Sequence, residues 1–244
     1  MTELLYLCRM DIQPIAFCES PLKTKFGIPR QSGLVDELTG RIVFESAFRR
    51  MEAVRGMEEF DYLWLIWEFL DKRSGKGGSP EVRKQEPEEM SLTVRPPRLG
   101  GNRRMGVFAT RSPFRPNPLG LSCVRLDRVE EDPRLGPVIY VRGADLMDGT
   151  PIFDIKPYVV YADARPDARS GFVDKTAWEP LEVIIPEALA NRIPIEHIDT
   201  LRATLAQDPR PAFHNDPERI YGMAFLDMDI RFRVSNGILT VISV

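Results

Sequence analysis

Residues 95–120, RPPRLGGNRRMGVFATRSPFRPNPLG, constrain the fold of this chain more than any other stretch. They include six arginines, five prolines and four glycines, but no lysine and no acidic residue. The segment cannot be a regular helix, because proline removes backbone donors and glycine adds backbone entropy. Arginine binds phosphate or carboxylate bidentately and stays charged at any working pH. We therefore expect a loop preformed for an anion; a surface loop with scattered ion pairs is the alternative.

The chain has the size and composition of a globular protein. Its 244 residues, 43% of them hydrophobic, suit one large domain or a medium domain with a smaller appendage. No apolar run reaches the ~20 residues that a membrane span needs. Glu3, Arg9 and Asp11 interrupt the N-terminus, which argues against a signal peptide. We expect a cytoplasmic protein that does not contact a membrane.

The cysteines and histidines do not form a metal or nucleophile motif. Cys8, Cys18 and Cys123 lack CxxC spacing, and His197 and His214 are far apart in the sequence. We therefore expect no metal site, no disulfide framework and a buried apolar role for each cysteine. A Cys–His catalytic pair is the alternative.

The charge of the chain is distributed unevenly. A formal net charge of −3 does not by itself predict a nucleic-acid binder. Residues 95–128, however, contain eight arginines and one acid, Asp127. The distribution therefore allows a local basic face.

The first two thirds of the chain are typical of a β-barrel. Short apolar or β-rich runs, bounded by glycine and proline, are expected strands at 6–18, 41–48, 61–70, 106–110, 119–129, 137–145 and 152–160. Strands at such short spacing favour a closed or nearly closed antiparallel barrel over a βαβ fold. Residues 71–90, rich in charge and glycine, indicate a surface insertion.

The last third is expected to be a small α+β appendage. Its predicted elements are a helix at 186–206 and a hairpin of strands at 220–234 and 237–244, turned at Asn236-Gly237. We therefore predict a mainly β protein, with an antiparallel barrel domain over 1–165 and a small α+β domain over 166–244.

Four loops carry the polar groups that could form a site. The sequence lacks a G-x-G-x-x-G loop and a P-loop lysine motif, which removes the usual nucleotide-binding patterns. The four loops are 25–31, 95–120, 148–154 and 207–213. Loops on a barrel rim can converge on one pocket, so they predict an anionic small molecule or nucleic acid bound at the barrel mouth.

These motifs, in this order, resemble the TrmO (YaeB-like) family of tRNA methyltransferases. The matching stretches are SPLKTKFGIPRQ, AVRGMEEFDYLWLIW, RPPRLGGNRRMGVFATRSPFRPNPLGLS, DGTPIFDIKPYVVYADA and LAQDPRPAF. The resemblance covers residues 12–165 apart from the insertion and resumes at 205–213. It implies a homodimeric β-barrel enzyme that uses S-adenosyl-L-methionine. The family methylates the 6-amino nitrogen of N6-threonylcarbamoyladenosine beside the anticodon of tRNA.

The resemblance also implies which residues contact the cofactor. They are Pro29, Arg30, Gln31, Arg111, Leu121, Asp148, Gly149, Thr150 and Pro151. A further family contact falls at Leu70 and Asp71, where a histidine is usual, so a contact there requires backbone groups. Arg30 and Arg111 can take the cofactor carboxylate or RNA phosphates. Asp148-Gly149 also makes a good turn without a ligand.

The expected acceptor site lies in the C-terminal motif. Asp208 is the candidate general base, and Arg210 is the candidate partner of the threonyl carboxylate. The alternative is that Asp208-Pro209 only ends the helix.

The basic face is expected to contact the tRNA anticodon stem-loop. Its predicted contacts are Arg95, Arg98, Arg103, Arg104 and Arg115. Phe114 is either a platform on which an RNA base stacks or part of the core. Two other functions stay open: a non-catalytic RNA-binding barrel, and a methyltransferase for a small acidic metabolite.

Overall fold

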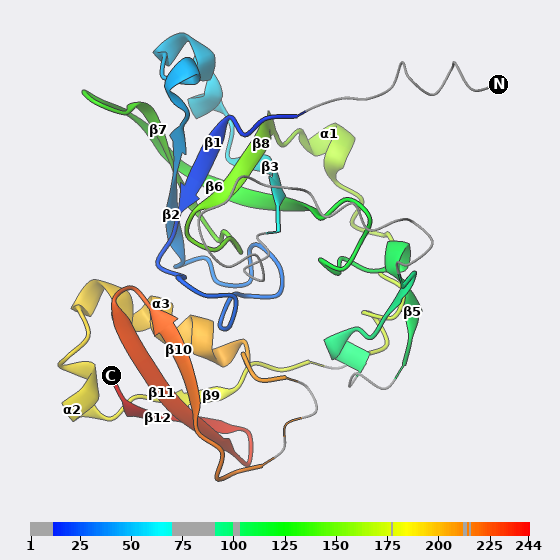
Figure 1. Ribbon diagram of the computed structural model, residues 1–244, viewed down its shortest axis with the longest axis vertical. Helices are drawn as coiled ribbons and strands as arrows, with labels where there is room; N and C mark the ends of the chain where they lie inside the picture. The colour runs from blue at the N-terminus through cyan, green and yellow to red at the C-terminus, as the bar shows by residue number, and fades with distance from the viewer. Residues whose placement is uncertain (1–11, 70–90, 100–102, 177, 212–213, 215) are drawn as a thin grey trace.

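The chain folds into a barrel and a second, smaller sheet domain (Figure 1). The computed structural model describes residues 12–69, 91–99, 103–176, 178–211, 214 and 216–244. The predicted insertion at 71–90 lies outside these residues. Within them, none of the helices combines the length and apolar character needed to cross a membrane.

Six strands close into an antiparallel barrel in the order β1-β2-β7-β6-β3-β8. They are β1 (Ala16–Glu19), β2 (Thr39–Phe44), β3 (Tyr62–Glu68), β6 (Leu119–Asp132), β7 (Gly136–Arg142) and β8 (Thr150–Pro157). A short helix, α1 (Val160–Asp163), follows β8. The predicted mainly β fold with an antiparallel barrel is confirmed.

Alternating side chains fill the barrel. In β3, Leu63, Leu65 and Trp67 point inward and are almost fully buried, as the two-residue period of a strand requires. The Trp67 ring lies directly over Gly120 in β6, where a Cβ atom would fall 2.3 Å from the ring. The ring of Phe69 packs edge-on against Trp67, with the ring centres 4.4 Å apart. Gly120 is therefore required for the position of Trp67.

Short irregular elements surround the barrel. Three 3-10 helices, Ser46–Phe48, Met51–Val54 and Met57–Glu59, follow β2. A two-stranded ladder joins β4 (Thr93–Val94) and β5 (Met105–Gly106), and further 3-10 turns lie at Pro97–Leu99 and Val107–Ala109.

The predicted strand at 106–110 is therefore wrong beyond Gly106. The backbone N–H of Thr110 donates to the Val107 carbonyl at 3.2 Å, and the Thr110 hydroxyl donates to the same oxygen at 2.9 Å. These two hydrogen bonds close a local turn, whereas in a strand the Thr110 N–H would bond to a neighbouring strand.

The C-terminal domain is a four-stranded sheet with helices. Its strands are β9 (Glu182–Ile184), β10 (Tyr221–Phe225), β11 (Met228–Ser235) and β12 (Ile238–Ser243), in the order β10-β11-β12-β9. Two helices precede β10, α2 (Glu187–Ala190) and α3 (Ile195–Ala206). The predicted turn at Asn236-Gly237 is confirmed, with both residues at positive φ.

Two C-terminal predictions are wrong in detail. The helix expected at 186–206 is interrupted, because Pro194 caps α3 and disfavours helical geometry in the residue before it. The strand expected at 220–234 is split by a turn at Leu226, whose φ is 53°. The Leu226 N–H donates to the Pro21 carbonyl at 2.8 Å, a tertiary contact that supports this left-handed residue.

The loop between β1 and β2, residues 20–38, is called the connecting segment. Its residues Leu22, Val35 and Leu38 are buried in the core of the C-terminal domain rather than in the barrel. Leu22 pairs with Phe225 in an isolated bridge, and a Cβ at Gly27 would meet the Met223 sulfur at 2.1 Å. Part of the predicted first domain is thus packed into the core of the second (Figure 1).

The packing of Trp67 on Gly120 predicts a stability effect. We expect Gly120→Ala to lower the free energy of unfolding by ~1–3 kcal/mol, because the new methyl group overlaps the ring. Urea denaturation monitored by tryptophan fluorescence measures this. Gly106→Ala is the matched control, since an added Cβ there meets no atom within 4 Å. Equal destabilisation of both variants would contradict the packing argument.

Candidate functional site

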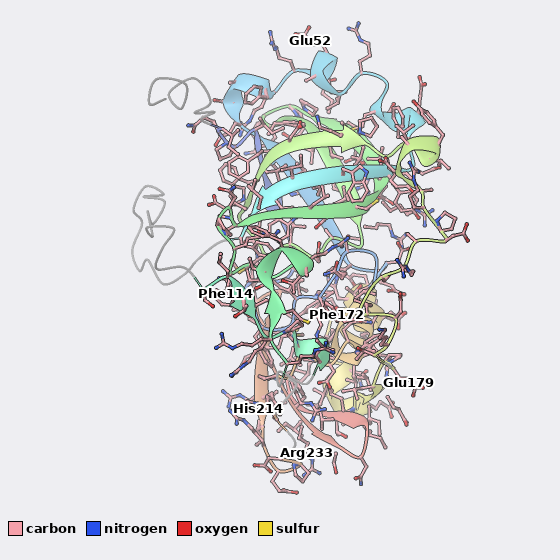
Figure 2. All side chains as sticks on the ribbon, turned by 90° about the vertical axis from the view of Figure 1, so that its right-hand side faces the viewer. Glu52, Phe114, Phe172, Glu179, His214 and Arg233 are labelled. Atoms are coloured by element: carbon pink, nitrogen blue, oxygen red, sulfur yellow. The ribbon has the colours of Figure 1, made fainter. Side chains whose placement is uncertain are left out.

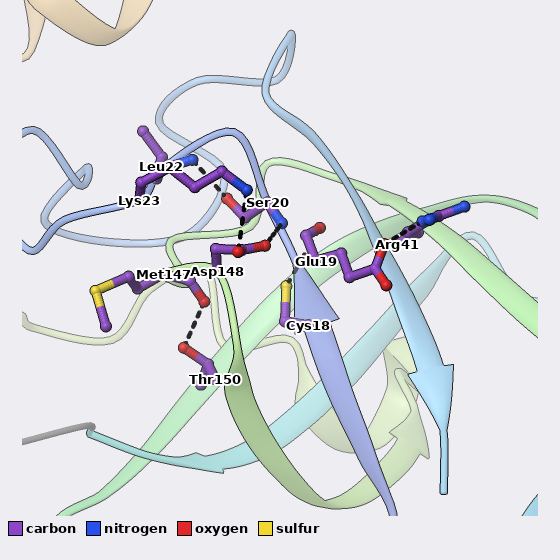
Figure 3. A network of polar contacts seen from close by, with 9 residues as sticks. All are labelled: Cys18, Glu19, Ser20, Leu22, Lys23, Arg41, Met147, Asp148 and Thr150. Carbon is purple, nitrogen blue, oxygen red and sulfur yellow. Dashed lines mark hydrogen bonds and ion pairs between the residues drawn. The ribbon is translucent and has the colours of Figure 1, made fainter. Parts of the chain in front are cut away.

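A polar network holds the turn that begins β8 against the connecting segment (Figure 3). One oxygen of Asp148 accepts a hydrogen bond from the Ser20 N–H at 3.0 Å, and the other lies 3.0 Å from Lys23 Nζ. The Asp148 N–H in turn donates to the Leu22 carbonyl at 2.9 Å. Asp148 therefore fixes the start of the connecting segment to the barrel, and its carboxylate stays about one-third exposed.

Asp148 is the first residue of the DGTP turn, residues 148–151. The other residues of this turn are fixed by its own backbone geometry. Gly149 has a φ of 77° and open space where a Cβ would stand, so the positive φ is what requires glycine there. Its N–H donates to the Cys18 carbonyl at 2.8 Å. The buried Thr150 donates from its hydroxyl to the Met147 carbonyl at 2.6 Å, and Pro151 is buried beside it. The predicted turn at Asp148-Gly149 is confirmed.

A second polar link joins the connecting segment to residues 95–120, which are called the arginine-rich segment. Arg111 donates from Nη1 to Gln31 Oε1. Desolvation raises the pKa of Asp145 above its ordinary value, although the Ser122 hydroxyl, Arg111 and the Ser32 N–H favour its charged form. Ser32 is the residue after Gln31. The structure thus brings Arg111 and the loop that carries Gln31 together near a half-buried carboxylate.

Leu121 lies on the outer face of β6, and 55% of its surface is exposed. The next residue, Ser122, points into the barrel and is buried. Leu121 therefore offers an apolar surface at the same end of the barrel as the two polar links. Leu70 and Asp71 lie outside the described residues.

A pocket of about 440 Å³ lies where the connecting segment meets the C-terminal domain. Polar and charged residues on its wall include Lys25, Arg30, Arg95, Gln207, Asp208 and Arg210. Four of these six are cations, so the pocket suits an anionic group. Gln207 Oε1 is buried and accepts no hydrogen bond from the described residues.

Asp208 and Arg210 form a bidentate ion pair on the pocket wall. Arg210 Nε lies 2.8 Å from Oδ1 of Asp208, and Nη2 lies 2.9 Å from Oδ2. This bonding raises the pKa of Arg210. Asp208 adopts a φ of 49°, and its carbonyl lies 3.5 Å from Nη2 of Arg30. Asp208 therefore orients Arg210, a pairing that the sequence did not indicate.

The arginine-rich segment presents exposed side chains of two kinds. Arg95, Arg103 and Arg104 are exposed, and Arg104 donates to the Thr93 hydroxyl at 2.9 Å. Phe114 is 68% exposed, so the core-packing alternative for it is wrong (Figure 2). Arg115 is half-buried and donates to the Thr110 carbonyl at 3.2 Å, which ties it to its own loop. Arg98 belongs to the 3-10 turn Pro97–Leu99, but its side chain lies outside the described part of the structure.

Two features of this site were missed from the sequence. Asp145 is the last residue of a predicted strand, although its position between apolar neighbours could have marked it as a partly buried acid. Lys25 lies in one of the four predicted loops, but the sequence did not indicate a role for its side chain. Lys25 and Arg95 line the same pocket because of tertiary packing, which no local pattern predicts.

Cys18 and Cys123 are poorly suited to act as nucleophiles, and Cys8 lies outside the described residues. Burial, with carboxylates nearby, raises the pKa of Cys18 to about 12, and burial also raises the pKa of Cys123. A thiol needs a lowered pKa to react as thiolate. In the described part of the chain, no three His, Cys, Asp or Glu side chains are grouped so that they could hold a metal ion.

Comparison with known proteins matches nearly the whole chain. Residues 17–164 match the family model of the tRNA-methyltransferase O N-terminal domain, and residues 179–244 match that of the TrmO C-terminal domain. An Escherichia coli K12 protein named tRNA (adenine(37)-N6)-methyltransferase is 37% identical over 93% of this chain and 94% of its own.

A named sequence and a solved structure, both from Pseudomonas aeruginosa, are also similar. One, named putative S-adenosylmethionine-dependent methyltransferase RcsF, is 39% identical over 91% of both chains. The other is a solved structure described as TrmO, with a TM-score of 0.73, 31% identity and coverage of 97% of this chain and 98% of that one. The two family models, these relatives and the shared fold agree: this chain belongs to the tRNA-methyltransferase O family.

Proposed function

We propose that this protein transfers a methyl group from S-adenosyl-L-methionine to the 6-amino nitrogen of N6-threonylcarbamoyladenosine, next to the anticodon of tRNA. The names of its relatives support the coarser part of this proposal, methylation of adenine 37 at N6 and use of this donor. The threonylcarbamoyl group as part of the substrate rests on the family resemblance and on the chemistry of the pocket.

One observation carries the proposal: a single loop, residues 29–31, forms part of two sites. On one side, Gln31 bonds to Arg111, which lies near Asp145. On the other side, Arg30 lines the basic pocket and approaches the carbonyl of Asp208. A methyl donor and a methyl acceptor must lie in line for the displacement, so adjoining sites are what this reaction needs.

The residues of the first site fit the donor. Asp148 can accept from hydroxyl or amino groups, Arg111 can bind a carboxylate, and exposed Leu121 offers apolar contact. When bound, S-adenosyl-L-methionine supplies an activated methyl carbon, and the protein holds and orients it. Pro29, Arg30, Gln31, Gly149, Thr150 and Pro151 complete the proposed donor contacts.

The basic pocket fits the acceptor. A threonylcarbamoyl group carries a carboxylate, a hydroxyl and ureido N–H groups. Lys25 and Arg95 supply positive charge for the carboxylate, together with Arg210. We keep Asp208 as the candidate base, with the added role of holding Arg210 in place.

The pairing of Asp208 with Arg210 yields a test of its role. We expect Asp208→Asn to lower kcat at saturating tRNA by ~10² if Asp208 accepts the proton of the acceptor nitrogen. Single-turnover kinetics with threonylcarbamoyl-modified tRNA measure this. Exposed Asp216→Asn is the control. A rise in the KM for tRNA with kcat unchanged would leave Asp208 only its role as the partner of Arg210.

The exposed arginines predict a salt-dependent affinity for tRNA. Replacing Arg95, Arg103 or Arg104 by Ala should weaken binding and reduce the slope of log affinity against log salt by ~1 for each phosphate that is no longer neutralised. Filter binding across a salt series measures the slope. Arg50→Ala is the control, because Arg50 is exposed and pairs with Glu52 at the far end of the barrel from Phe114 (Figure 2). An unchanged slope would contradict the basic-face assignment.

Nucleoside analysis tests the function itself. We expect tRNA incubated with this protein and S-adenosyl-L-methionine to lose threonylcarbamoyladenosine and gain its N6-methyl derivative. Donor binding without tRNA modification, but with turnover of a small acidic metabolite, favours the metabolite enzyme. Binding of tRNA without calorimetric binding of the donor favours a non-catalytic RNA-binding barrel. The resemblance also implies a homodimer, which sedimentation of the purified protein tests.

A further inference from the structure

Asp145 occupies a position that the donor contacts do not explain. It is half-buried between β7 and β8, with almost fully buried Ala144 and Leu146 on either side. Burying a carboxylate is costly unless charge or hydrogen bonds compensate for it. The groups that compensate for the cost of burying the Asp145 carboxylate therefore indicate its role.

These groups come from segments far apart in the chain. The Ser122 hydroxyl, from β6, donates to Asp145 Oδ1 at 2.5 Å. The Ser32 N–H, from the connecting segment, and the Arg111 guanidinium favour the charged carboxylate. A backbone bond reinforces the same junction, since Gly33 N–H donates to the Gly143 carbonyl at 2.8 Å.

Ser122 is itself held on its other side. The Trp67 indole N–H donates to the Ser122 oxygen at 2.9 Å, and both residues are buried. Trp67 in turn rests on Gly120. The chain Trp67–Ser122–Asp145 thus runs from the rigid barrel interior to the connecting segment, and each bond satisfies a buried polar group.

Each of these anchors is adjacent in sequence to a proposed donor contact or is one itself. Ser32 follows Gln31, and Ser122 follows Leu121. Arg111 is both a proposed contact and a neighbour of Asp145. Resting on the proposed function, we infer that Asp145 is a positioning residue of the donor site. It fixes the loops that carry Gln31 and Arg111 relative to strand β6, which carries Leu121.

Two variants test this inference. Each changes a different partner of the hydrogen bond between Ser122 and Asp145. Asp145→Asn removes the charge at nearly constant volume, and Ser122→Ala removes the hydroxyl. We expect either to raise the donor Kd and KM by ~10-fold, with kcat at saturating donor within ~3-fold of wild type and the tRNA Kd unchanged. The double variant should show less than the sum of the two effects, because both changes break the same link.

A pH series separates positioning from a merely structural role. Because burial raises the pKa of Asp145, its carboxylate takes up a proton at a higher pH than an ordinary aspartate. Donor affinity of the wild type should therefore fall as the pH is lowered through that range, and Asp145→Asn should lack this step. Of the other groups nearby, the Cys18 thiol stays protonated because burial raises its pKa, and Arg111 and Asp148 are present in both proteins.

The controls keep the outcomes distinct. Asp132→Asn changes the carboxylate of the last residue of β6, at the other end of the strand from Leu121, and should leave donor affinity unchanged. Thermal melting checks that each variant is folded; if Asp145→Asn is not, Ser122→Ala decides. Wild-type donor affinity and pH dependence in both folded variants would overturn the inference and leave the proposed function intact. A wild-type protein that binds no donor would overturn both.

Discussion

The architecture depends on one segment that packs against two cores. The connecting segment leaves the barrel at β1, buries Leu22, Val35 and Leu38 among C-terminal residues, and returns to the barrel at β2. Burying such side chains stabilises the fold by about 1.5–3 kcal/mol each. The loop 29–31 lies within this segment, so its position is set by the barrel and the C-terminal domain together.

The sequence predicted the barrel because its signals are local. The apolar run of β3 and the turn residues Asp148-Gly149 depend on neighbours along the chain. The turn at Leu226 could not be predicted in this way. A leucine at positive φ is unfavourable by itself, and the bond that supports it comes from Pro21, distant in sequence. Pro194, by contrast, was a visible signal for the break before α3.

The site was predictable in its residue types but not in its pairings. Arginine, proline and glycine in the arginine-rich segment mark an anion-binding surface whatever the fold. The ion pair of Asp208 with Arg210 and the hydrogen bond of Ser122 to Asp145 arise only from tertiary geometry. Sequence reasoning therefore found the candidates Asp208 and Arg210 as separate groups, whereas the structure shows them as one unit.

The central claim is that donor and acceptor sites adjoin at the loop 29–31, between the barrel and the C-terminal domain. A crystal structure of the protein with S-adenosylhomocysteine, the demethylated donor, tests this most directly. The account predicts that the ligand contacts Gln31, Arg111, Leu121 and the DGTP turn and leaves the basic pocket open. A ligand seated instead among Lys25, Arg95 and Arg210 would contradict it.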